Sequence, residues 1–138
     1  MRTPQQRRFV LDASAAVALL ADAGPAGAWV ESTVQDGALA APEPMPFEAA
    51  NILRRQAASG LLDATAATLA HADLVSLPID FFPYAVVAER AWQLRENFTL
   101  HDASYVALAE LTEAALVTST VGSAAPPEPP ARCSPTSK

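Results

Sequence analysis

The sequence predicts an α/β fold in which helices cover a short parallel sheet. Short apolar runs that suit buried strands alternate with longer segments of helical periodicity. This alternation favours a parallel sheet with helical crossovers, and the ligands of such sheets gather at the carboxyl ends of the strands. The chain has 138 residues, 51% of them hydrophobic, which suits one domain with a substantial core.

The first strand and two helices are predicted from the N-terminal segment. Residues 8–12 form a short buried strand whose apolar run ends at Asp12. A helix over residues 13–22 follows, capped by Asp12 or Ser14. Pro25 opens the next helix, which ends before an Asp-Gly turn signal.

A second strand, residues 39–41, leads into a segment that three prolines keep extended. The next helix is expected to begin near Phe47, with Gly60 as its C-cap. Four apolar residues around this helix have the spacing of a buried face: Phe47, Ala50, Leu53 and Leu61.

The second half of the chain continues the alternation. Residues 62–74 have the pattern of a helix, and residues 75–80 that of a third strand. Pro83 interrupts the chain before a helix over residues 84–96. The last two elements expected are a helix and a strand, over residues 101–113 and 115–118.

The character of the sequence changes after Thr118. Residues 119–138 contain five of the chain's twelve prolines and show no apolar periodicity. We therefore expect a domain over residues 1–120 and a proline-rich, disordered tail over residues 121–138.

Composition and charge restrict the function. The net charge of −6 argues against nucleic-acid binding through a broadly basic surface. It leaves open a metal-dependent nuclease, whose site gathers acids. Two arginine pairs, Arg54 with Arg55 and Arg90 with Arg95, are either phosphate contacts or solvated helix faces.

The expected location is the cytoplasm. No apolar run is long enough to cross a membrane, and Asp12 interrupts the N-terminal run that would otherwise resemble a signal peptide. The lone Cys133 gives no disulfide framework, as expected in a reducing compartment.

The main functional signal is a set of three acids: Asp12, Glu48 and Asp102. Asp12 and Asp102 each open an Asp-Ala-Ser sequence between an apolar run and a helical segment. Each aspartate is either a helix cap or a ligand of Mg²⁺ or Mn²⁺, which prefer carboxylate oxygens. Glu48 is either a ligand or a first-turn glutamate. His101 either touches substrate or is simply exposed.

These residues carry a resemblance to the PIN-domain ribonucleases, and within them to the VapC toxins of bacterial toxin–antitoxin pairs. VLDASAAVALL resembles the opening strand of the family with its first acid, Asp12. FEAANILRR resembles the second acidic motif, with Glu48, and AWQLRENFTLHDASYVALAE resembles the third, with Asp102. LVT at 116–118 resembles the strand that leads to a fourth acid, where this chain has Thr120.

The resemblance implies a PIN-like α/β/α sandwich and a Mg²⁺- or Mn²⁺-dependent endoribonuclease. Asp12, Glu48 and Asp102 would hold the metal, with Ser14, Thr118 and Thr120 close by. A metal-activated water would cleave the phosphodiester, leaving a 5′-phosphate and a 3′-hydroxyl. The resemblance further implies a homodimer, a VapB-type antitoxin and contact with DNA only through that antitoxin.

Thr120 leaves an alternative function open. A hydroxyl is a weaker ligand for a hard divalent ion than a carboxylate. The chain is then either an active ribonuclease or a catalytically weak PIN-domain binding module that pairs with an antitoxin.

Overall fold

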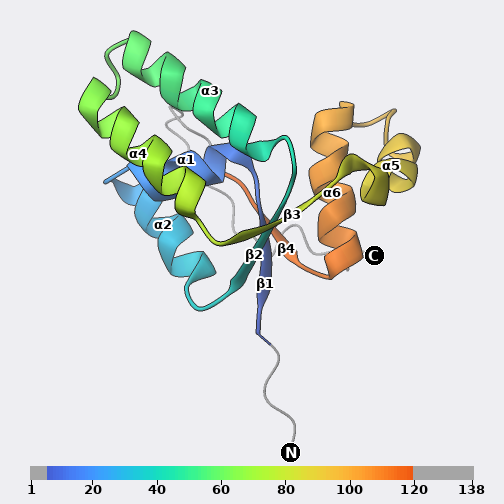
Figure 1. Ribbon diagram of the computed structural model, residues 1–138. Helices are drawn as coiled ribbons and strands as arrows, with labels where there is room; N and C mark the ends of the chain where they lie inside the picture. The colour runs from blue at the N-terminus through green and yellow to red at the C-terminus, as the bar shows by residue number, and fades with distance from the viewer. Residues whose placement is uncertain (1–5, 120–138) are drawn as a thin grey trace, which may run out of the picture.

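A computed structural model describes residues 6–119 and shows one parallel sheet (Figure 1). Its four strands lie in the order β3-β2-β1-β4. The strands are β1 (Arg8–Leu11), β2 (Ala38–Pro42), β3 (Ile79–Phe82) and β4 (Ala115–Val117). All three pairings are parallel, which confirms the predicted α/β class. The expected tail, residues 121–138, lies outside the described residues.

Six helices cover the sheet in two layers. Figure 1 shows four of them on one side, namely α1 (Ala13–Ala21), α2 (Pro25–Val34), α3 (Met45–Ala58) and α4 (Ala64–Ser76). The other side carries α5 (Tyr84–Gln93) and α6 (Leu100–Thr112). The expected α/β/α sandwich is confirmed. Within residues 6–119 no single helix is long and apolar enough to span a membrane, although the bent pair α1 and α2 has the length and composition.

Strand β1 lies at the centre of the core. Phe9, Val10 and Leu11 are at most 1% exposed, because β2 and β4 flank the strand and helices cover it. The backbone N–H of Asp12 donates to the carbonyl of Val117 at 3.2 Å. This bond aligns the carboxyl ends of β1 and β4, so the residues that follow both strands meet at one edge of the sheet.

Helix α3 buries Leu53 as predicted, but part of its buried face differs from the prediction. It begins at Met45, and its buried residues are Met45, Ala49 and Leu53. Phe47 is 77% exposed and Leu61 is 69% exposed, so both were wrongly predicted to be buried. The helix begins two residues earlier than expected, and a spacing of four residues from Met45 sets its buried face.

The third strand is also displaced from its predicted position. Residues 75–80 were expected to form it, but α4 runs to Ser76 and β3 begins at Ile79. Leu74 extends the buried face of α4, and the helix stops just before Pro78, which disfavours helical geometry in the preceding residue. Helix α5 ends at Gln93, three residues before the predicted end.

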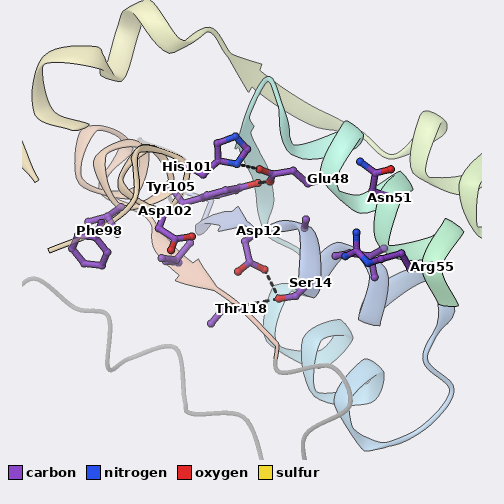
Figure 2. Close-up of a pocket in the computed structure, with 14 residues that line it drawn as sticks. Asp12, Ser14, Glu48, Asn51, Arg55, Phe98, His101, Asp102, Tyr105 and Thr118 are labelled. Atoms are coloured by element: carbon purple, nitrogen blue, oxygen red, sulfur yellow. Dashed lines mark hydrogen bonds and ion pairs between the residues drawn. The ribbon is translucent and has the colours of Figure 1, made fainter. Parts of the chain in front are cut away.

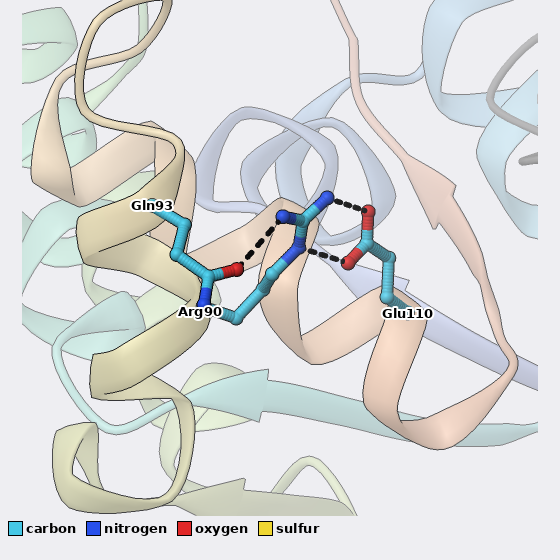
Figure 3. A network of polar contacts seen from close by, with 3 residues as sticks. All are labelled: Arg90, Gln93 and Glu110. Carbon is cyan, nitrogen blue, oxygen red and sulfur yellow. Dashed lines mark hydrogen bonds and ion pairs between the residues drawn. The ribbon is translucent and has the colours of Figure 1, made fainter.

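Helices α5 and α6 are joined by a bidentate ion pair (Figure 3). Arg90 Nε lies 2.7 Å from Glu110 Oε1, and its Nη2 lies 3.3 Å from Oε2. Gln93 accepts a third hydrogen bond, from Arg90 Nη1, at 3.0 Å. The contact with Glu110 raises the pKa of Arg90. Arg90 therefore links two helices and is not available as the phosphate contact considered above.

The corner between α1 and α2 is packed tightly. The two helices are bent by 107° relative to each other. A Cβ placed on Gly27 would lie 1.9 Å from the carbonyl oxygen of Asp22 and 2.6 Å from that of Ala18. Only a residue without a side chain fits here unless the backbone moves.

Candidate active site

A cavity of about 580 Å³ lies at the carboxyl edge of the sheet. Asp12, Glu48 and Asp102 all line it, although they come from the end of β1, from α3 and from α6 (Figure 2). The sequence therefore identified three acids that the fold brings to one cavity. Their role as metal ligands remains a prediction.

Asp12 is both a helix cap and a cavity residue. Its Oδ1 accepts hydrogen bonds from the Ala15 N–H at 2.9 Å and from Ser14 Oγ at 2.8 Å. The two interpretations considered for this residue are therefore compatible. One carboxylate oxygen closes the first turn of α1, while the side chain faces the cavity.

Asp102 occupies a different position from Asp12, despite the shared Asp-Ala-Ser sequence. Thr99 caps α6 by accepting from the Asp102 N–H at 3.1 Å, and Asp102 lies within the first turn. The apolar run before it forms a turn instead of a strand. In residues 6–119 no hydrogen bond to the exposed Asp102 carboxylate is found. The repeated sequence thus brings the two acids together without giving them equivalent structures.

Glu48 is held by two residues of α6. The Tyr105 hydroxyl donates to Glu48 Oε1 at 2.6 Å, and His101 Nδ1 lies in close contact with Oε2. His101, Asp102 and Tyr105 lie within one turn of α6, so a single helix end supplies an acid and two groups that hold another acid. The sequence analysis missed Tyr105. Its spacing of three residues from Asp102 was the available signal.

Burial raises the pKa of two groups that line the cavity. Burial raises the pKa of Asp12, and the nearby charge of Asp102 adds to the rise. Hydrogen bonds from Ala15 and Ser14 and the Thr118 hydroxyl oppose it. Burial, followed by the hydrogen bond to Glu48, raises the pKa of Tyr105 far above its ordinary value. Tyr105 therefore remains a proton donor to Glu48.

Ser14 ties the end of β4 to the start of α1. Its Oγ accepts from the Ser119 N–H at 3.0 Å and lies 3.3 Å from Thr118 Oγ1, while donating to Asp12. Ser14 and Thr118 thus lie beside Asp12, as the resemblance implied. Thr120, the third residue expected there, is outside the described part of the chain.

The carboxylates of Asp12, Glu48 and Asp102 are the type of ligand that a hard divalent cation prefers. Carboxylate oxygens from three segments face one solvent-accessible cavity, and a cation beside Asp12 would offset the cost of burying its charge. Yet over residues 6–119 no three Asp, Glu, His or Cys side chains are grouped so that they could hold a metal as they stand.

Comparison with known proteins gives the family. The profile of the PIN domain matches residues 9–120. The chain belongs to the PIN-domain family. This assignment confirms the resemblance found in the sequence and fits the parallel sheet with acids at its carboxyl edge.

Relatives of this PIN domain include several VapC proteins. It is 35% identical to Ribonuclease VapC12 and 37% identical to Ribonuclease VapC9, both of Mycobacterium tuberculosis. Each match spans 110 residues, covering 80% of this chain and 84% of the relative. The similarity to VapC proteins therefore extends across nearly the whole domain.

Two solved structures share the fold of this PIN domain. VapC20 of Mycobacterium tuberculosis, described as a toxin that cleaves the sarcin–ricin loop, superposes with a TM-score of 0.60 over 83% of this chain and 91% of its own, at 16% identity. PAE2754 from Pyrobaculum aerophilum superposes with a TM-score of 0.58 over 81% of this chain and 74% of its own, at 27% identity. Both support the α/β/α arrangement described above.

Proposed function

We propose that this PIN domain is a VapC-type toxin that cleaves RNA by a Mg²⁺- or Mn²⁺-dependent mechanism. The observation that carries the proposal is the convergence of Asp12, Glu48 and Asp102 on one cavity. Relatives named as ribonucleases match the chain at 35–37% identity and supply the substrate class.

Asp12, Glu48 and Asp102 are the residues that would hold the cation. When bound, the cation supplies an activated water and neutralises charge on the phosphodiester. Ser14 and the N–H of Ala15 fix the Asp12 carboxylate, so little reorganisation is needed at that position. Each oxygen of Glu48 retains a second lone pair, so Tyr105 can keep it oriented while it also faces a cation.

The proposed partners follow from the same relationship. A VapC-type toxin in the cytoplasm would pair with a VapB-type antitoxin, form a homodimer and meet DNA only through the antitoxin. Co-expression with a candidate antitoxin, followed by co-purification, tests this part independently of catalysis.

Cleavage of single-stranded RNA by the purified chain, with and without Mn²⁺ or Mg²⁺, tests the proposed activity. Asp12→Asn and Asp102→Asn should each lower the rate by at least about 100-fold, because each removes a charged cation ligand. Asp63→Asn is the matched control, since Asp63 also caps a helix, accepting from Thr65 N at 3.1 Å, but does not line the cavity. Equal cleavage by all four proteins would overturn the proposal.

A further inference from the structure

We propose that the cavity grips single-stranded RNA at two positions that flank the carboxylates, with Arg55 on a backbone phosphate and Phe98 stacked on a base. This inference rests on the proposed function, because it specifies how the substrate of that same site is held. Figure 2 shows the two side chains on opposite sides of Asp12, and both line the cavity.

Arg55 reaches the cavity because of its spacing along α3. Glu48, Asn51, Ile52 and Arg55 recur at intervals of three and four residues, so they share one face of the helix, and all four line the cavity. The neighbouring Arg54 lies off this face and does not line the cavity. One member of the arginine pair is thus placed beside the acids and the other is not.

Arg55 also differs from other arginines in its contacts. Arg90 is paired with Glu110, Arg95 donates to the Trp92 carbonyl at 2.8 Å, and Arg54 Nε donates to Asn51 at 3.4 Å. Arg8 donates to a carbonyl, and Arg7 lies over the ring of Phe9. No hydrogen bond, ion pair or ring contact of the Arg55 side chain is found within residues 6–119. Its charge is available to an anion in the cavity.

Phe98 provides an aromatic surface at the other side. It lies in the turn between α5 and α6, lines the cavity and is 39% exposed. The more exposed aromatic residues Phe47 and Trp92 do not line the cavity. A partly exposed ring and a positively charged side chain in one cavity are the combination with which proteins hold single strands, whose bases are free to stack.

The charge of the cavity explains why RNA binding there would need both Arg55 and Phe98. Three carboxylates repel a phosphodiester, and a bound cation offsets only part of that repulsion. Arg55 adds positive charge on one side, and stacking on Phe98 adds attraction that does not depend on charge. A duplex lacks a free base face for Phe98, so the arrangement favours an unpaired strand.

The test measures the binding of a fluorescein-labelled, unstructured RNA by anisotropy across a salt titration. The salt dependence distinguishes the phosphate contact of Arg55 from the stacking contact of Phe98. All variants are made in an Asp12→Asn background so that cleavage does not consume the probe, and circular dichroism confirms their folding. Arg55→Ala should weaken binding about tenfold. It should also make the negative slope of log K against log salt shallower by about 0.7, which is the value for one lost phosphate contact to a single strand. Arg55→Lys should retain the slope. Arg54→Ala, the matched control, should change neither quantity.

Phe98→Ala should weaken binding about tenfold with the salt slope unchanged, because stacking releases no counterions. Phe98→Trp should restore affinity, and Phe47→Ala should have no effect. The same strand annealed to its complement should bind worse than the single strand. If Arg54→Ala and Arg55→Ala behave alike, if Phe98→Ala is neutral, or if the duplex binds equally well, the inference is wrong.

The two proposals fail in distinguishable ways. The predicted binding pattern without cleavage by the wild-type chain at any Mn²⁺ concentration would retain the strand site and overturn the nuclease. Cleavage with the binding pattern absent would retain the nuclease and overturn the strand site.

Discussion

At the scale of single residues, the buried charge of Asp12 couples the site to stability. Burial raises the pKa of this carboxyl above its ordinary value of 3.8, so the folded protein binds a proton more tightly than the unfolded chain does. The stabilising effect of protonation is therefore complete at low pH and is lost as pH rises through the folded pKa. Above that pKa the metal-free protein carries the cost of the buried charge.

Asp12→Asn should accordingly raise the stability of the metal-free protein at neutral pH. Asparagine keeps an oxygen that can accept from Ala15 and Ser14, so the cap survives while the charge is removed. Urea denaturation over a pH series should show the advantage of the variant shrinking as pH falls toward 3.8. An advantage that does not vary with pH would mean that the charge of Asp12 is not the cause.

Tyr105 gives a second prediction at this scale. Tyr105→Phe removes the 2.6 Å bond to Glu48 and leaves a partly buried carboxylate without its hydroxyl partner. We expect a loss of about 1–3 kcal/mol in the free energy of unfolding, as for other hydrogen bonds to charged groups. Mn²⁺ affinity, measured by calorimetry, should fall too, because Glu48 loses its orientation. Tyr84→Phe is the control, because Tyr84 is exposed and its hydroxyl makes no hydrogen bond within residues 6–119.

Thr120 gives a third prediction at the scale of single residues. Thr120→Asp should raise both Mn²⁺ affinity and the RNA cleavage rate, because a carboxylate supplies charge where a hydroxyl supplies none. A Mg²⁺ titration of wild type and variant checks this. Strong wild-type cleavage at low Mg²⁺ that the substitution does not improve would show that the three other acids suffice.

Sequence reasoning located the acids because their type and setting are local properties. Asp12 follows an apolar run, and Glu48 and Asp102 stand near helix starts. The hold of Tyr105 and His101 on Glu48 depends on how α3 and α6 face each other, which no local pattern encodes.

At the scale of elements, Gly27 at the corner between α1 and α2 has the tightest surroundings of the glycines in residues 6–119. Gly27→Ala must displace the carbonyl of Asp22, so we expect a loss of about 1–3 kcal/mol in stability, as overpacking commonly costs. Gly24→Ala is the control, because its added Cβ would meet only the end of the Asp22 side chain, at 3.1 Å. Chemical denaturation of both variants gives the comparison, and equal stability of the two would show that the corner is looser than described.

The order and type of every element were predictable, but several boundaries were not. The short apolar runs are strands that helices cover on both faces of the sheet, and the segments of helical periodicity are those helices. The structure therefore shows the same alternation as the sequence. The limits of α3, α4 and β3 depend on which residue first contacts the core. Met45 and Leu74 are buried and help to set these limits through packing, which depends on the tertiary structure. Phe47 and Leu61 were misplaced for that reason.

At the scale of the whole molecule, a cation should act as a stabiliser of the fold. Mn²⁺ held by carboxylates from β1, α3 and α6 binds only when these segments are together, so binding adds to the free energy of unfolding. The gain is about 2.7 kcal/mol at roughly 100 times the dissociation constant. Thermal unfolding with and without Mn²⁺ measures it, and Asp12→Asn should abolish most of the shift. An unchanged melting temperature for the wild-type chain would argue against a formed site.

The pairing of β1 with β4 has a consequence for synthesis on the ribosome. Phe9 pairs with Ala115, so the central strand stays without one neighbour until the segment around residue 115 has been made. Asp102 and Tyr105 come from the same late part of the chain. A growing chain thus carries Asp12 without a completed cavity until that part of the chain has been made, and such distant contacts form slowly. A chain built this way forms its cavity only after the segment that carries Asp102 and β4 has been made.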